Sequence, residues 1–118
     1  MRSPARAMST RPKHLLVLNT CPGSITAKKI ANELVADQLA ACVQVIPGVQ
    51  SFFRWGGRVE NSEEHLLLIK TTAERYADVE NRIRALHPYE LPEIVAVPLS
   101  GGLEGYLAWI VDSTKIRK

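Results

Sequence analysis

The chain has 118 residues, of which 46% are hydrophobic, and this is enough for one domain with its own core. Seven of its 15 basic residues lie in 1–13 and 115–118. The part between them has 8 basic and 12 acidic residues, and therefore a net charge of about −4. A nucleic-acid-binding domain needs a basic surface on the fold itself. The charge distribution therefore argues against nucleic acid as the partner.

The first 13 residues carry four basic side chains and no acid, and they lack the apolar stretch of a secretory signal. We expect a disordered basic leader over 1–13 and a single domain over 14–118. No apolar run approaches the roughly 18 residues of a membrane helix, so no membrane partner is expected. The two cysteines, Cys21 and Cys42, form no disulfide framework. A reducing cytoplasm is the default location.

Residues 14–20 form a continuous apolar run, which is typical of a strand buried on both faces. Cys21-Pro22-Gly23 breaks this run, and Ser24 can cap a following helix through its hydroxyl. That helix should end between residues 38 and 40. Its apolar positions recur at helical spacing, at Ala27, Ile30, Ala31 and Leu34.

The stretch 41–72 predicts a long β-hairpin. Gly56-Gly57 suits the positive-φ positions of a tight turn, and Pro47-Gly48 predicts a bulge. Each arm is well over the usual strand length of about five or six residues. An aromatic edge of this length would aggregate unless something covered it. We therefore expect a partner subunit over Phe52, Phe53 and Trp55.

Thr71 and Glu74 have capping-box spacing ahead of a second helix, which Pro88 should end. A strand over 93–99 and a short helix over 103–111 complete the chain. The order β-α-β-β-α-β predicts an α+β, ferredoxin-like sandwich with a long central hairpin and a C-terminal helix. The apolar stripe of the second helix contains Tyr76, Val79, Ile83 and Leu86.

We expect the first and third strands to be parallel neighbours. The ends of these strands and the start of the fourth strand should then meet at one edge of the sheet, with the Trp55 turn at the opposite end. The residues predicted to converge there are Asn19, Cys21, Lys70, His87, Tyr89, Glu90 and Glu93.

This convergence is the candidate functional site. The Cys21 thiolate with the His87 imidazole suits copper or zinc, and an imidazole with carboxylates suits zinc, nickel or copper. His87 can equally be a cation that the helix dipole favours at a helix C-terminus. Lys70 can attract an anion, whereas His65, beside Glu64, is expected to be solvated. No nucleophile–base triad or phosphate loop is present, so no enzyme is predicted.

From about Leu15 to Val111 the sequence resembles the CutA1 divalent-cation-tolerance family. No single motif would be specific, but six of them occur in order. They are Leu-Ala-Ala-Cys-Val (39–43), Ile-Pro-Gly-Val (46–49), Arg-Trp-x-Gly-x-Val-Glu (54–60), Ile-Lys-Thr (69–71), His-Pro-Tyr-Glu-x-Pro-Glu (87–93) and Tyr-Leu-x-Trp (106–109).

The resemblance implies a ferredoxin-like subunit, a homotrimer similar in architecture to the PII signalling proteins, and binding of Cu²⁺ or another divalent cation. His87 matches the family's conserved histidine, and Tyr89 and Glu93 match cleft-lining positions. Asn19 stands where some bacterial relatives have a cysteine, and Leu86 where they have a second histidine.

Two functions follow as hypotheses. The first is a trimeric copper-binding protein that acts in metal tolerance, with His87 and Cys21 as ligands. The alternative is a PII-like module that binds a small anionic effector near Lys70 in an inter-subunit cleft. The partner protein or small-molecule effector is not specified by the residues.

Overall fold

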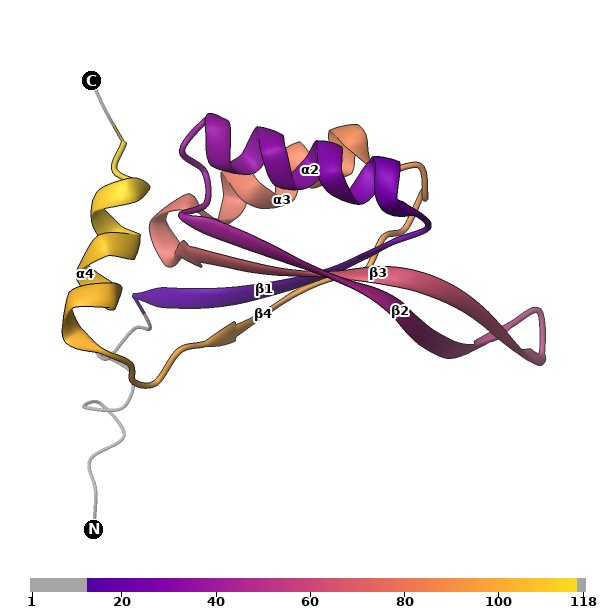
Figure 1. Ribbon diagram of the computed structural model, residues 1–118. Coiled ribbons are helices and arrows are strands. Elements are labelled where there is room, and N and C mark those ends of the chain that lie inside the picture. Colours follow the sequence, from indigo (N-terminus) through magenta and orange to yellow (C-terminus); the bar gives the residue numbers. More distant parts are fainter. Residues whose placement is uncertain (1–12, 117–118) are drawn as a thin grey trace, which may run out of the picture.

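The computed structural model describes residues 13–116 (Figure 1), so the expected leader lies, apart from Lys13, outside the described residues. The predicted order of elements is confirmed, and the chain is an α+β sandwich. A short 3-10 turn (Ala73–Arg75) precedes α3. The elements are β1 (His14–Cys21), α2 (Ser24–Ala36), β2 (Cys42–Trp55), β3 (Arg58–Thr72), α3 (Tyr76–Leu86), β4 (Ile94–Pro98) and α4 (Glu104–Ser113).

The sheet has the strand order β2-β3-β1-β4, and its neighbouring strands are all antiparallel. The expected parallel pairing of the first and third strands is therefore wrong. The α2 crossover makes β2 parallel to β1, and the hairpin then returns β3 between them, so that β3 runs against both. In the observed register Cys21 faces His65, whereas Leu16 faces Lys70.

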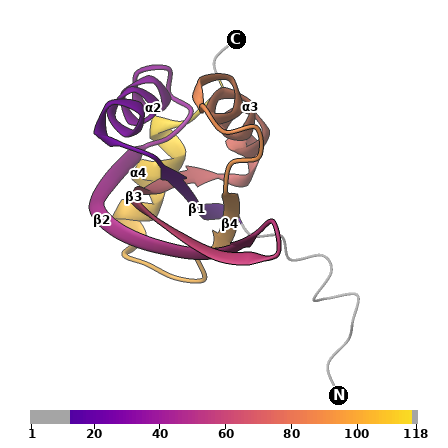
Figure 2. The same cartoon turned by 90° about the vertical axis from the view of Figure 1, so that its right-hand side faces the viewer.

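Helices α2 and α3 lie side by side on one face of the sheet (Figures 1 and 2). Alternate residues of each strand point into this layer. The core contains Val17, Leu67 and Ile69 from the sheet, packed against Ile30, Leu34, Val79 and Ile83 from the two helices. No helix of the described residues is long and apolar enough to cross a membrane.

The other face of the sheet is also apolar, and we call it the open face. The strand register pairs Leu18 with Leu68 and Val95, and Leu16 with Val97, in alternation with the buried core residues. Because α2 and α3 both lie on the opposite side, part of this apolar surface stays in solvent: Val95 is 47% and Val97 42% exposed. The open face consists of Leu16, Leu18, Ile46, Leu66, Leu68, Val95 and Val97.

The long hairpin has the predicted bulge and turn. Gly56 and Gly57 have φ values of 61° and 77°, which suit a type I′ turn. The β2–β3 register shifts between Ile46 and Val49, and Gly48 in this bulge has a φ of 75°. The hairpin extends well past the helices, and its tip stands clear of the rest of the fold (Figure 1).

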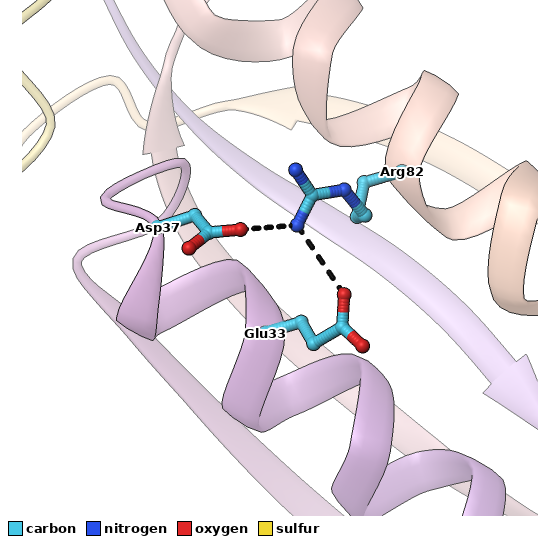
Figure 3. Close-up of polar contacts among 3 residues, drawn as sticks. All are labelled: Glu33, Asp37 and Arg82. Atoms are coloured by element: carbon cyan, nitrogen blue, oxygen red, sulfur yellow. Dashed lines mark hydrogen bonds and ion pairs between the residues drawn. The ribbon is translucent and has the colours of Figure 1, made fainter.

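The two expected helix caps are absent. Gly23, not Ser24, occupies the N-cap of α2, and no side chain caps it. The Thr71 hydroxyl is buried and donates to the Leu39 carbonyl oxygen at 2.7 Å, and Thr72 occupies the N-cap of the following turn without a side-chain hydrogen bond. An ion pair instead links the two helices: Arg82 of α3 contacts Glu33 at 3.4 Å and Asp37 at 2.5 Å (Figure 3).

Candidate functional site

The candidate site lies where β1 ends beneath the segment 87–93, which joins α3 to β4. The segment is attached to β1 at both of its ends. Near its start, the His87 ring Nε2 lies 2.7 Å from the Thr20 carbonyl oxygen. At its end, the Asn19 side-chain amide donates to the Glu93 carbonyl oxygen at 2.8 Å. Antiparallel pairing of Asn19 with Ile94 brings these groups together.

Cys21 is completely buried at this end of β1. Its thiol donates to the Asn19 Oδ1 atom over 3.3 Å. Burial, and secondly the nearby Glu64 carboxylate, raise the pKa of the Cys21 thiol from 9.0 to about 11. Because the thiolate is the form that binds metals and reacts with electrophiles, Cys21 is held in an inert form at neutral pH.

His87 is 7% exposed, and both of its ring nitrogens have partners. In addition to the Nε2 contact with Thr20, Nδ1 accepts a hydrogen bond from the Tyr89 backbone N–H at 3.1 Å. The imidazole and phenol rings are 4.7 Å apart between centroids. His87 therefore joins the end of β1 to the start of the segment 87–93.

Tyr89 continues this network to β3. Its phenol donates to the Glu64 carboxylate at 3.0 Å. Burial raises the pKa of the Tyr89 phenol, and the hydrogen bond to Glu64 raises it further. Glu64 itself is 5% exposed. The chain of contacts thus runs from Thr20 through His87 and Tyr89 to Glu64.

Sequence reasoning missed Glu64 and His65, because it gave Glu64 no role in the site and expected His65 to be solvated. His65 faces Cys21 across the β1–β3 pair, and its Nδ1 atom is buried without a partner among the described residues. Both positions follow from the antiparallel register, which sets the middle of β3 beside the end of β1. Assignment of that register would have been the only sequence-level signal.

Lys70 does not belong to this site. In the observed register it pairs with Leu16 and Cys42, near the start of β1, whereas Cys21 lies at the other end of that strand. Its ammonium donates to the Gln44 side-chain oxygen. The expected meeting of Lys70 with Cys21 and His87 is therefore wrong, for the same reason as the parallel pairing.

The hairpin tip lies at the same end of the sheet as Cys21 and His87, and not at the opposite end as expected. β3 enters from the tip and meets Cys21 at His65, before it reaches the start of β1. The three predicted interface aromatics are all exposed in the single chain, with Phe52 at 68%, Phe53 at 43% and Trp55 at 71%.

The donor groups at this end do not form a metal site within one chain. Glu90 and Glu93 have exposed side chains, whereas Cys21 and His87 are buried and engaged. Across residues 13–116, no three His, Cys, Asp or Glu side chains are grouped so that they could hold an ion. A shallow cavity of about 450 Å³, lined in part by Lys13, His14 and Lys115, lies at the other end of β1.

Comparison with known proteins gives the family. The family model described as "CutA1 divalent ion tolerance protein" matches residues 15–113. The divalent-cation tolerance protein CutA of Thermus thermophilus is 46% identical over 99 residues, which cover 84% of this chain and 96% of that protein. The chloroplastic protein CutA of Arabidopsis thaliana is 39% identical over 86% of this chain, which spans only 56% of that relative.

Solved structures indicate the same family. A Thermus thermophilus structure titled "Divalent cation tolerance protein (Cut A1)" superimposes with a TM-score of 0.85 at 44% identity, covering 86% of this chain and 99% of that one. The CutA crystal structure from Xylella fastidiosa superimposes with a TM-score of 0.85 at 44% identity, and the match covers 86% of this chain and 98% of that one. Because sequence, fold and family model all coincide over nearly the whole domain, this chain belongs to the CutA1 divalent ion tolerance family.

Proposed function

We propose that this chain serves divalent-cation tolerance as a homotrimer, with its ligand site formed between subunits. The main support is the open face, where the leucines of β1 and β3 and the valines of β4 lie outside the layer covered by α2 and α3. A contiguous exposed apolar surface on a small domain marks an interaction site. Exposed Phe52 and Trp55 on the hairpin tip supply aromatic anchors of the kind that dominate protein interfaces.

Copper, or another divalent cation, is the ligand that we propose first, because of the family to which the chain belongs. The described chain offers exposed carboxylates at Glu90 and Glu93 beside the candidate site, but no group of three donors. Divalent ions in proteins take four to eight ligands. The remaining donors would therefore come from a neighbouring subunit, which links cation binding to assembly.

A PII-like module that binds a small anion is the second candidate function, and Lys70 supports it. Lys70 is half-buried on the apolar open face beside Leu16, and its ammonium makes an exposed hydrogen bond to Gln44. A second subunit that covered this face would desolvate the ammonium further. A buried charge is costly unless it is paired, so an anion, or a carboxylate of the neighbouring subunit, would be favoured there.

Calorimetric titration of the purified protein with Cu²⁺, Zn²⁺ and a panel of nucleotides distinguishes the two functions. Light scattering on the same samples gives the oligomeric mass. Cation binding that weakens in Glu93→Gln and persists in Lys70→Met would support the cation site. Nucleotide binding with the reverse dependence would support the anion site. A monomer mass at micromolar concentration would refute the trimer.

A further inference from the structure

The two hydrogen bonds of His87 fix the form of its ring. The Thr20 carbonyl can only accept, so Nε2 must carry the proton that it receives over 2.7 Å. The Tyr89 backbone N–H can only donate, so Nδ1 must be unprotonated where it accepts that bond over 3.1 Å. The two partners together select the neutral Nε2–H imidazole.

This arrangement leaves no lone pair for a metal. A metal-bound imidazole needs one nitrogen free to ligate. In His87 the lone pair of Nδ1 already accepts the Tyr89 N–H, and Nε2 bears a hydrogen. Coordination through either nitrogen would leave the Thr20 carbonyl or the Tyr89 amide without its partner. Unpaired polar groups of this kind are costly when buried.

The Cys21 thiol is also unavailable as a metal ligand. The side chain is fully buried, and its S–H donates to Asn19. The amide of Asn19 also donates to the Glu93 carbonyl oxygen, so a metal bound by the thiol would break a hydrogen bond to a side chain that holds the segment 87–93. The histidine and thiol that the sequence offers as copper ligands therefore do not fit a metal in this fold.

We propose that His87 is a positioning residue and not a metal ligand. It holds the segment 87–93 on the end of β1 and aims the Tyr89 side chain at Glu64. The distances support this role at each step: 2.7 Å to Thr20, 3.1 Å to the Tyr89 amide, and 3.0 Å from the Tyr89 phenol to Glu64. The inference stands whether or not a cation binds elsewhere on the protein.

Nitrogen-15 NMR of the imidazole tests the ring directly in the unmodified protein. The expected spectrum has a protonated Nε2 and an unprotonated Nδ1 for His87, with ring resonances that do not change when Zn²⁺ alone is added. A protonated Nδ1, or a shift of the His87 nitrogens that saturates at stoichiometric Zn²⁺, would overturn the proposal. This measurement needs no variant and so does not depend on one that folds.

Two variants separate positioning from ligation. His87→Ala removes both hydrogen bonds, whereas the side-chain amide in His87→Gln can still donate to the Thr20 carbonyl. If His87 positions Tyr89, the ionisation of the Tyr89 phenol, assigned with Tyr89→Phe, should move to lower pH in His87→Ala and partly recover in His87→Gln. Zn²⁺ affinity should be alike in all three proteins. A loss of about tenfold or more in both variants, with no movement of the tyrosine titration, would make His87 a ligand.

Discussion

Val95→Lys should dissociate the proposed trimer without unfolding the subunit. Val95 lies on the open face beside Leu18 and is 47% exposed in the single chain, so a lysine there can reach water in the monomer. In the trimer the same lysine would lie in an apolar interface. Loss of the remaining valine burial costs about 1 kcal/mol, and a partly desolvated ammonium at least as much again. About 2 kcal/mol per subunit, or about 6 kcal/mol per trimer, corresponds to a roughly 10⁴-fold weaker assembly.

Val35→Lys is the matched control, because Val35 is 42% exposed on α2, in the layer opposite the open face. Light scattering over a concentration series measures the assembly, and circular dichroism measures whether the subunit is folded. We expect a folded monomer for Val95→Lys and an unchanged trimer for Val35→Lys. A trimer mass for Val95→Lys at low micromolar concentration would refute the assignment of the open face to the interface.

Three further predictions test individual contacts. Arg82→Met should lower the free energy of unfolding by about 0.5–1 kcal/mol in low salt, since the Arg82 side chain is only 31% exposed and pairs with two carboxylates. Arg58→Met removes a more exposed pair and should change the free energy of unfolding little. Denaturant titration measures both variants. The raised pKa of the Cys21 thiol, about 11, means that the unfolded chain ionises first above pH 9. The contribution of Cys21 to stability is therefore intact below pH 9 and should fall by about 2–3 kcal/mol as the pH rises to 11, so Cys21→Ala should lose less stability than the unmodified protein over this range. Trp55→Ala should lower the melting temperature and promote dissociation of the trimer. Trp55 is 71% exposed in the single chain, so its stabilising contacts would have to come from a neighbouring subunit. An unchanged melting curve and an unchanged oligomeric mass would place Trp55 outside any interface.

Local patterns predicted the elements correctly because their causes are local. The turn at Gly56-Gly57 requires positive φ at two successive positions, and glycine is the residue that supplies it without strain. The bulge at Gly48 has the same origin. The C-terminal end of α3 follows from Pro88, since the residue before a proline avoids the helical region.

Both helix caps were mispredicted by one residue, because Gly23 and Thr72 occupy the N-cap positions instead of Ser24 and Thr71. The spacing of Thr71 and Glu74 satisfies a capping box, yet the Thr71 hydroxyl lies in the helix-covered layer and bonds the Leu39 carbonyl. A capping hydroxyl must accept a hydrogen bond from a first-turn N–H, whereas the Thr71 hydroxyl acts as a donor to a loop that is distant in sequence. Sequence spacing contains no information about that distant partner.

Part of the candidate site was mispredicted because the direction of β3 relative to β1 was assigned wrongly. With β3 taken as parallel to β1, Lys70 falls beside Cys21; with the antiparallel register, His65 and Glu64 take that place. The grouping of Asn19, His87, Tyr89 and Glu93 is confirmed because it depends on β4, whose start was expected beside the end of β1 and is found there. Sheet topology therefore decides which polar groups meet, even when every element is assigned correctly.

Cation binding and assembly should be inseparable in this protein. Within residues 13–116, a single chain presents carboxylates beside the candidate site but no complete set of donors, while the buried imidazole and thiol are already engaged. If subunits complete the site, the monomeric Val95→Lys should lose cation affinity although Val95 carries no donor atom. His87→Gln, which stays trimeric on this reasoning, should keep that affinity. Equal affinities of the monomer and the trimer would mean that the cation binds within one subunit, and that the neighbouring chain contributes nothing to it.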